Sequence, residues 1–205
     1  MFTGIIQEIG FIKSIKPLAK GKEVVVSASQ VLPSLKLGDS IAINGACSTA
    51  IAITSSSFTV QFLEETLKKT TFSSLKVKQK VNLELSLTPS THMGGHFVSG
   101  HVDDVGKLLK LEKKSPWGLI QIEFKPQFRP YLISKGSITI DGISLTVVDI
   151  TESTFTCHLI PHTLANTNLS EKRAGDGVNL EYDMIGKYLY NFVVLKQTSP
   201  QLFKE

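Results

Sequence analysis

The sequence predicts an all-β chain of two tandem, homologous antiparallel barrels, followed by a C-terminal α-helix. Two observations support this fold class. The segment from Phe2 to Ser86 recurs as Val98 to Asp183, in matching order. Each copy also contains about six short runs of branched and aromatic residues bounded by turn-forming residues, which is typical of small barrels. Because this period is longer than the roughly 20 to 50 residues of solenoid units, each copy should fold around its own core.

Four matching blocks carry the repeat. Residues 2–10 match 98–106, residues 40–49 match 137–146, residues 62–67 match 159–164, and residues 80–84 match 177–181. Blocks in the same order and nearly the same register are difficult to produce by chance. They predict an N-terminal barrel over 1–96, a C-terminal barrel over 97–183, and a separate tail over 184–205.

The expected strands are short and occur in both copies. They cover residues 24–26, 40–43, 58–62, 81–85, 119–124, 137–140, 145–150, 155–159 and 178–182. Branched and aromatic residues are frequent in these runs, and Gly, Pro, Asn, Asp or Ser bound them. Asn44-Gly45 and Asp141-Gly142 separate apolar runs, and such pairs predict tight hairpin turns.

Helical segments are expected at four places. Residues 33–35, 65–69 and 127–133 predict short helical turns. Beyond Met184, apolar residues return at the three-and-four spacing of an amphipathic helix, namely Ile185, Tyr188, Leu189, Phe192, Val193 and Leu195. Both barrels should close before this helix begins, so we favour its apolar face as an oligomerisation surface over packing on its own domain.

Composition excludes several classes of protein. The chain has 205 residues, 41% of them hydrophobic and 20% charged, which suits an ordinary globular protein with two small cores. Its net charge of +4 comes from scattered lysines rather than a basic block, so nucleic acid is not an expected partner. Cys47 and Cys157 form no CxxC pair, which argues against a disulfide scaffold or structural zinc. With no signal-like or bilayer-length apolar segment, we expect a cytoplasmic protein outside the membrane.

The histidines near the centre of the chain do not predict a metal site. His92 and His96 have HxxxH spacing, and His101 follows five residues later. Gly94-Gly95 interrupts the helical face that such a metal motif needs. The GxSxG, Walker, GxGxxG and HExxH motifs are all absent, which removes the usual hydrolase, NTPase, dehydrogenase and zincin readings.

Small polar residues follow the two predicted hairpin turns in matching places. Cys47 and Thr49 in the first copy correspond to Ser144 and Thr146 in the second. Alternate residues of a strand point to the same face, so each pair should share one surface. Either pair alone could be polar residues satisfied locally. Their duplication favours a pocket in each copy.

Four motifs give the chain a specific resemblance. They are the opening Met1-Phe2-Thr3-Gly4-Ile5, the block 44–49 (NGACST), the junction 94–103 (GGHFVSGHVD) and the block 141–146 (DGISLT). In this combination the chain resembles the riboflavin synthase alpha-chain family, from Met1 to about Ile185.

The resemblance implies two six-stranded Greek-key barrels and a homotrimer assembled through the C-terminal helix. Each barrel would bind one 6,7-dimethyl-8-ribityllumazine, with the active site between the N-terminal barrel of one subunit and the C-terminal barrel of the next. Two substrates would dismutate by four-carbon transfer to riboflavin and 5-amino-6-(D-ribitylamino)uracil, without cofactor or metal. Association with a lumazine synthase shell is left open.

The resemblance also implies the substrate contacts. For the first barrel these are Gly4, Ile5, Ile6, Cys47, Ser48, Thr49, Gln61, Phe62, Leu63, Glu64, Glu65 and Thr66. For the second they are Gly100, His101, Val102, Lys135, Ser144, Leu145, Thr146, His158, Leu159, Ile160, Pro161, His162 and Thr163. Ser40 and Asp183 lie at strand ends where family members have polar residues near the site.

Catalytic roles follow from residue chemistry. The reaction must remove a proton from the methyl group at C7 of one substrate and add a nucleophile at C7 of the other. We expect His101 to shuttle the proton, because an imidazole titrates near neutral pH. Cys47, Ser144, Thr146, Asp183 and Ser40 are the remaining candidate catalytic residues. Stacking two rings in register should supply much of the rate.

The two predicted pockets are not identical. The matched pairs that differ are Ile5 and His101, Asn44 and Asp141, Cys47 and Ser144, Glu65 and His162, and Ser86 and Asp183. Identical substrates in different surroundings can act as four-carbon donor and acceptor, although the sequence does not assign the roles. The chain also departs from the family at Ala46, Ser48 and His162, where members commonly have Cys, Leu and Glu.

A non-catalytic protein of the same fold is the main alternative. Fluorescent lumazine or flavin antenna proteins bind one ligand per chain and generally keep only one intact pocket motif. Both copies here retain the turn, the Thr and the small nucleophile, which favours the enzyme. A purely structural role would leave these polar residues without a use.

Overall fold

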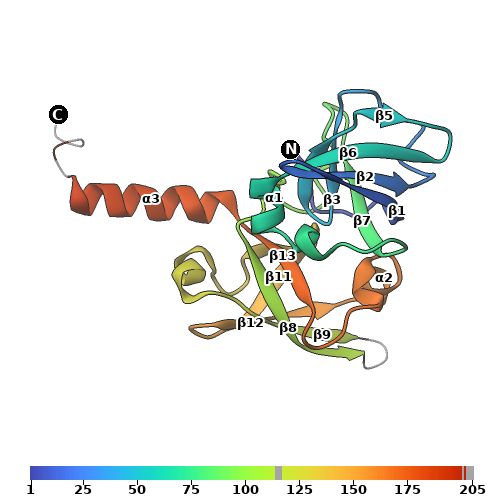
Figure 1. Cartoon of the computed structure of the whole chain (residues 1–205). Helices are drawn as coiled ribbons and strands as arrows, with labels where there is room; N and C mark the ends of the chain where they lie inside the picture. The colour runs from blue at the N-terminus through green and yellow to red at the C-terminus, as the bar shows by residue number, and fades with distance from the viewer. Residues whose placement is uncertain (114–116, 200, 202–205) are drawn as a thin grey trace.

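The chain folds into two β-rich domains that lie side by side, with a C-terminal helix projecting away from both (Figure 1). The structure, a computed structural model, describes residues 1–113, 117–199 and 201. Each domain contains one copy of the sequence repeat, and the strands pair antiparallel throughout. The predicted fold class is confirmed. The last residues of the expected tail, 200 and 202–205, lie outside the described residues.

The first copy forms a seven-stranded sheet with the order β4-β3-β7-β1-β2-β6-β5. Its strands are β1 (Glu8–Leu18), β2 (Gly21–Ser27), β3 (Ser40–Ile43), β4 (Ala46–Thr49), β5 (Ala52–Ile53), β6 (Ser57–Leu63) and β7 (Lys80–Leu85). Strand β4 pairs with β3 and strand β5 pairs with β6, so the sheet curls round between Thr49 and Ala52.

The second copy forms a closed barrel with the order β10-β11-β12-β9-β8-β13. Its strands are β8 (Asp104–Lys113), β9 (Gly118–Glu123), β10 (Ser137–Ile140), β11 (Ile143–Ile150), β12 (Thr154–Leu159) and β13 (Gly177–Tyr182). The unbroken β11 occupies the sequence position that β4 and β5 share in the first copy. Both copies therefore follow the same six-stranded topology, except that the strand corresponding to β11 is divided into β4 and β5 in the first copy.

The sequence analysis missed the first strand of each copy. Strand β1 has a register shift between Ile12 and Ser14, and β8 has one between Leu108 and Lys110. An extra residue at a bulge moves the following side chains to the opposite face, so the apolar alternation changes phase within the strand. A pattern search that requires strict alternation does not recognise such a strand.

The two predicted hairpin turns lie back to back at the junction of the copies. Asn44, Gly45, Asp141 and Gly142 all have positive φ, between 43° and 82°. This conformation suits the Asn-Gly and Asp-Gly pairs. A Cβ built on Gly45 would lie 2.7 Å from the backbone nitrogen of Gly142, and the reverse distance is the same. The glycines are therefore needed for both the turn and the contact between turns.

Buried polar side chains surround these turns and join the copies. The Asn82 side-chain amide donates to the Asp141 carbonyl, and that of Asn179 donates to the Asn44 carbonyl, at 2.9 and 2.8 Å. The Asp141 carboxylate forms an ion pair with Lys172 at 2.9 Å, although the Asp141 side chain is fully buried. The junction is thus polar and nearly symmetric in its backbone contacts.

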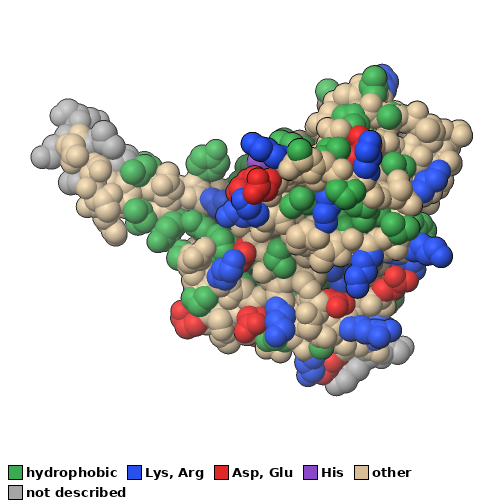
Figure 2. Space-filling model, in the orientation of Figure 1, with side chains coloured by type: hydrophobic (Ala, Val, Ile, Leu, Met, Phe, Trp, Pro, Cys, Tyr) green, Lys and Arg blue, Asp and Glu red, His purple; other side chains and the backbone are tan. Residues whose placement is uncertain are grey.

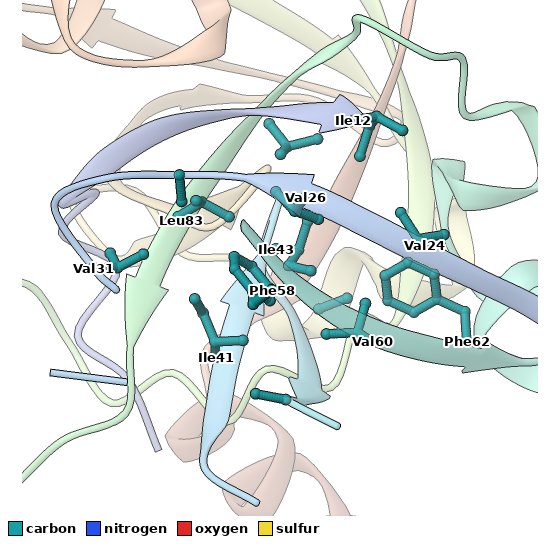
Figure 3. Packing of buried hydrophobic residues seen from close by; sticks show 14 of the residues in the cluster. Ile12, Val24, Val26, Val31, Ile41, Ile43, Phe58, Val60, Phe62 and Leu83 are labelled. Atoms are coloured by element: carbon teal, nitrogen blue, oxygen red, sulfur yellow. The ribbon is translucent and has the colours of Figure 1, made fainter. Parts of the chain in front are cut away.

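Each barrel has its own hydrophobic core. In the first copy, alternate residues of the strands point inward and meet, and they include Ile12, Val24, Val26, Ile41, Ile43, Phe58, Val60, Phe62 and Leu83 (Figure 3). The second core is built in the same way from β8 to β13 and includes Leu108, Ile120, Ile122, Ile138, Phe155 and Leu180. The strands are thereby fixed in register, which positions the residues on their outward faces.

The predicted short helices are found except one. Helix α1 (Glu64–Lys69) lies within one residue of its prediction, and the 3-10 helix η2 (Pro126–Tyr131) covers most of 127–133. Residues 33–35 belong to a single hydrogen-bonded turn, in which the Ser34 and Leu35 N–H groups both donate to the Val31 carbonyl. Helix α2 (Pro161–Ala165) and the 3-10 helices η1 (Thr71–Ser74) and η3 (Asn168–Ser170) complete the connections.

Helix α3 (Met184–Thr198) contacts the body through its first turns. The Asp183 side chain accepts from the Ile185 backbone, Lys187 pairs with Asp103 at 2.6 Å, and the Tyr131 and Tyr190 rings meet edge to face. Beyond these contacts, apolar side chains remain exposed along the projecting helix (Figure 2). Among the described residues, no helix is long and apolar enough to cross a bilayer.

Candidate functional site

The opening segments of the two copies are exchanged. Ser144 of the second copy donates its backbone N–H to the Gly4 carbonyl at 2.8 Å, and Cys47 of the first donates to the Gly100 carbonyl at the same distance. Phe2 and Val98 form the antiparallel bridge at the crossing point. The grouping expected above is therefore wrong: residues 4–6 lie with Ser144, and residues 100–102 lie with Cys47.

A buried glutamate holds each opening segment. The Glu84 carboxylate accepts from the Thr3 backbone, the Thr3 hydroxyl and the Gly4 backbone at 2.6–3.0 Å. Glu181 makes the same three contacts with Ser99 and Gly100 at 2.6–2.9 Å. Burial raises the pKa of both carboxyls, although these hydrogen bonds oppose the shift. The carboxylates fix the two glycines at the place where the opening segment changes copy.

The exchange creates a pocket of about 370 Å³ beside the first copy, named here the copy-one pocket. The hairpin strand β4, helix α1 and the exchanged segment surround it. Its lining residues are Ala46, Cys47, Glu65, Thr66, Lys69, Thr70, Gly100, His101, Val102 and Asp103. Six of the predicted contacts therefore line one cavity, namely Cys47, Glu65, Thr66, Gly100, His101 and Val102.

A second pocket, of about 560 Å³, lies between the start of the first copy and the α2 region of the second. It is lined by His162 and Asn166 from the α2 region, by Ile6 to Ile9 and Phe11 at the start of β1, and by residues 27–30. His162 occupies the place that Glu65 has in the copy-one pocket. Ser144 lies next to this region. It packs against Gly4, two residues before Ile6, so closely that a Cβ built on Gly4 would lie 2.6 Å from the Ser144 Cβ.

Strand alternation divides the predicted contacts into two groups. Cys47, Thr49, Ser144 and Thr146 point outward, whereas Ser48 and Leu145 are only 6% and 8% exposed. The outward residues at the strand ends are Gln61, Leu63, His158 and Ile160, and the core residues between them are Phe62 and Leu159. A ligand on the outer face can therefore meet the inward residues only through their backbone.

Several other predicted residues lie at defined structural positions. Asp183 caps α3 and lines a 340 Å³ pocket that also contains Ser137, the counterpart of Ser40. Ser40 begins β3 opposite Thr49. Lys135 is exposed and has a left-handed backbone, with φ of 65°. Of the remaining expected contacts, Ile5 is exposed in the opening segment before β1, and Glu64, Pro161 and Thr163 are exposed or half-buried in the short helices α1 and α2.

The sequence analysis did not identify His96 as part of the site. Its Nδ1 lies 2.7 Å from the Ser144 hydroxyl, and its Nε2 lies 3.3 Å from the Thr139 hydroxyl. Burial lowers the pKa of His96, and the negative charge of Asp183 partly opposes this shift. The Gly94-Gly95 pair was the available signal, since two glycines before a histidine permit close backbone approach.

The three linker histidines thus have different surroundings. His101 lines the copy-one pocket, His96 contacts Ser144, and His92 is exposed. In the part of the chain that the structure describes, no three His, Cys, Asp or Glu side chains gather in a metal-binding arrangement.

The duplicated fold and its paired pockets define a class of protein. The sequence model of the lumazine binding domain family matches residues 3–86 and again residues 99–183. The chain therefore belongs to the lumazine binding domain family, with one domain in each copy of the repeat.

Full-length relatives narrow this class. The chain is 45% identical over 193 residues to the riboflavin synthase of Bacillus subtilis, covering 94% of this chain and 90% of the relative. It is 43% identical to that of Actinobacillus pleuropneumoniae (96% and 91% covered) and 39% identical to that of Schizosaccharomyces pombe (94% of each).

A solved structure shares the fold. LumP complexed with 6,7-dimethyl-8-(1'-D-ribityl) lumazine superposes with a TM-score of 0.81 at 23% identity, covering 89% of this chain and 99% of LumP. The LumP complex with riboflavin gives 0.82 at 24% identity with the same coverage.

Proposed function

We propose that the chain is a riboflavin synthase. It converts two molecules of 6,7-dimethyl-8-ribityllumazine into riboflavin and 5-amino-6-(D-ribitylamino)uracil. The two substrates together contain all the atoms of the two products, so the four-carbon transfer balances without an external oxidant, reductant or cofactor. Relatives up to 45% identical over nearly the whole chain support this activity.

One observation carries the choice of an enzyme over a binding protein. Both copies keep an outward-facing pair at the same hairpin, Cys47 with Thr49 and Ser144 with Thr146. The first residue of each pair also donates its backbone N–H to a glycine carbonyl of the exchanged segment. Cys47 donates to Gly100, and Ser144 donates to Gly4. A protein that holds one ligand needs one such arrangement, whereas a dismutase needs two.

The two sites offer different groups to identical ligands. The copy-one pocket contains a thiol, a carboxylate and an imidazole, from Cys47, Glu65 and His101. The second site is the region around Ser144. There the Ser144 hydroxyl contacts His96, and the Asp183 carboxylate acts electrostatically on the same imidazole. Unequal surroundings let one bound ring lose a methyl proton while the other accepts a nucleophile at C7. His101 is the proton shuttle in the copy-one pocket, and Thr49 and Thr146 orient the two rings.

Assembly as a homotrimer through α3 belongs to the same proposal. The helix carries seven exposed apolar residues, Ile185, Tyr188, Leu189, Tyr190, Phe192, Val193 and Leu195. Such a surface is favourable only when another chain covers it. Sedimentation should give three chains per particle, and Leu189→Lys should shift the population towards single chains. A cytoplasmic location and association with lumazine synthase remain predictions of the family resemblance.

The decisive experiment supplies 6,7-dimethyl-8-ribityllumazine alone to the purified chain, without metal or nucleotide. Two substrates should disappear for each riboflavin formed. Tight binding of one fluorescent ligand per chain without turnover would instead identify an antenna protein of the LumP type. Release of riboflavin at any other substrate ratio would rule out a simple dismutation.

A further inference from the structure

A cavity of about 510 Å³, named here the junction cavity, lies between the segments that lead into β7 and β13. Its lining residues are Thr71, Ser74, Lys76, Val77, Lys78, Gln79, Lys80, Asn168, Glu171, Lys172, Asp176 and Gly177. These residues are all different from those that line the copy-one pocket and the pocket beside α2. The cavity meets β7 and β13 at their first residues, whereas Glu84 and Glu181, which hold the opening segments, lie near the strand ends. It is therefore separate from the candidate site.

Lysines outnumber carboxylates around the junction cavity, four to two. Two of the lysines are in ion pairs, namely Lys80 with Glu171 and Lys172 with Asp141. Among the residues that the structure describes, the ammonium groups of Lys76 and Lys78 form no ion pair. The second lining carboxylate, Asp176, accepts from the Arg173 backbone N–H at 2.8 Å and is held on its own turn. The cavity therefore has two cations without a carboxylate partner.

The two walls of the junction cavity differ between the copies. Lys78 and Lys80 of the first copy match Gly175 and Gly177 of the second. A Cβ built on Gly175 would meet no atom within 4 Å. Lys80 extends across the junction, since its ammonium group pairs with Glu171 of the second copy. The first copy thus supplies lysines where the second supplies glycines, which leaves space for an anion between them.

A buried hydroxyl also belongs to the junction cavity. Thr71 lines it, and the Thr71 backbone N–H donates to the Asn179 side chain of the second copy at 2.8 Å. Within the described part of the chain, the Thr71 hydroxyl is buried and forms no hydrogen bond. Buried polar atoms nearly always have a partner, because an unpaired one has lost its contacts with water. The Thr71 hydroxyl can therefore donate to an acceptor bound in the cavity.

We propose that the junction cavity binds a phosphate group, with Lys76 and Lys78 as its cations and the Thr71 hydroxyl as a neutral donor. A lysine ammonium group is a point charge with three N–H donors, which suits the oxygens of a phosphate. The volume of about 510 Å³ is typical of sites for small molecules. The Glu171 and Asp176 carboxylates can accept hydrogen bonds from hydroxyl groups. The ligand is therefore a small phosphorylated sugar or free phosphate, which share this recognition chemistry.

Calorimetric titration of the purified full chain tests the proposal, with inorganic phosphate, ribose 5-phosphate and ribose as probes. The ionic strength is held constant, because salt screens exposed charges. One phosphate-bearing ligand should bind per chain, and ribose should not bind measurably. Lys76→Gln and Lys78→Gln should each weaken phosphate binding about tenfold, as expected for loss of a charge-assisted hydrogen bond.

Two lysine variants are matched controls. Lys16→Gln removes an exposed lysine of β1, and Lys69→Gln removes a lysine that lines the copy-one pocket. Both should leave the dissociation constant for phosphate within about twofold, since a distant exposed charge is screened.

Thr71→Val separates ligand binding from a structural role. It keeps the branched shape and removes the hydroxyl, which should weaken phosphate binding about fivefold. Without phosphate, the unfolding free energy of this variant should equal or exceed that of the wild type, because the hydroxyl has no hydrogen bond to lose.

The three probes also distinguish the source of the phosphate. Tighter binding of ribose 5-phosphate than of phosphate would assign the carboxylate wall to the sugar, and equal binding would assign the site to the phosphate group alone. Absence of saturable binding by both phosphate probes would overturn the proposal. An equal loss in Lys69→Gln and Lys78→Gln would also overturn it. If Thr71→Val fails to fold, Lys76→Gln and Lys78→Gln decide the question, because both side chains are exposed.

Discussion

The two copies share most of their backbone contacts but differ in the side chains that carry a charge or face a ligand pocket. Both use a hairpin turn at the junction, a buried glutamate that holds the opening segment of its own copy, and an Asn that bridges to the other turn. The first copy has Asn44 in its turn, and the second has Asp141, whose charge is neutralised by Lys172. Divergence has kept the contacts that define the fold and changed the groups that define chemistry.

The Asp141–Lys172 pair offers the largest test of this comparison. Lys172→Leu introduces the residue of the matching first-copy position, Leu75, and leaves a fully buried carboxylate without its cation. Loss of one partner of a buried pair typically costs about 3–5 kcal/mol of unfolding free energy. Asp141→Asn/Lys172→Leu converts the second copy to the first-copy pair and should recover at least half of that loss in urea unfolding. A double variant as unstable as Lys172→Leu would contradict this account.

The second prediction concerns unequal nucleophile positions. Ser144→Ala should lower kcat about 100-fold, because it removes the hydroxyl that His96 contacts. Cys47→Ala should lower kcat by less than about tenfold, since the Cys47 thiol has mainly packing contacts. Steady-state turnover of both variants measures the difference. Equal losses would mean that the two copies contribute equivalent groups despite their different partners.

The buried glutamates provide a matched pair of stability tests. Glu84→Gln and Glu181→Gln each place an amide N–H₂ where a carboxylate oxygen accepts backbone hydrogen bonds, which should cost about 2 kcal/mol. Equal costs are expected, because the two carboxylates make the same set of contacts. Glu64→Gln on the exposed surface of α1 is the control and should change the unfolding free energy little.

The pH dependence of the same variants has a defined sign. Since burial raises the pKa of Glu84 above its ordinary value of 4.5, the folded chain binds this proton more tightly than the unfolded chain. Its contribution to stability therefore falls as the pH rises from 4.5 through the folded-state pKa. The gap between wild type and Glu84→Gln should narrow over that window, as measured by urea unfolding at successive pH values. A stability difference that widens as the pH rises would mean that the hydrogen bonds, rather than burial, have the larger effect on the pKa of Glu84.

The smallest expected effect concerns one turn position that has a lysine in the first copy and a glycine in the second. Lys78 has φ of 70°, and the corresponding Gly175 has φ of 97° with no atom within 4 Å of a built Cβ. A left-handed backbone costs a non-glycine residue about 1 kcal/mol. Lys78→Gly should therefore raise, and Gly175→Lys should lower, the unfolding free energy by about that amount. Thermal unfolding of both variants checks the opposite signs.

Local sequence signals were sufficient for the architecture but not for the exchange of segments. Asn44-Gly45 and Asp141-Gly142 are local turn signals, and the turns form as expected. The apolar spacing after Met184 likewise predicted α3. The crossing of Phe2 to Ile6 and Val98 to Val102 depends on long-range pairing with strands of the other copy, which alignment of the repeats does not reveal.

The candidate site shows the same limit. Cys47 and Ser144 were identified because the repeat aligns them and strand alternation exposes both. His96 was not, because its importance depends on a contact with a residue 48 positions away in the sequence. Ser48, Phe62, Leu145 and Leu159 belong to segments expected to contact the ligand, although their side chains point into the cores. Sequence patterns located the segments, whereas the packed structure was needed to assign individual side chains.

Ligand titration tests the central claim, that one chain carries two unequal lumazine sites, most directly. Calorimetric titration with 6,7-dimethyl-8-ribityllumazine at a temperature that suppresses turnover should give two sites per chain with different affinities. Thr146→Ala should weaken one site, and Thr49→Ala should weaken the other. A single site per chain, or two sites that both respond to the same substitution, would contradict the account.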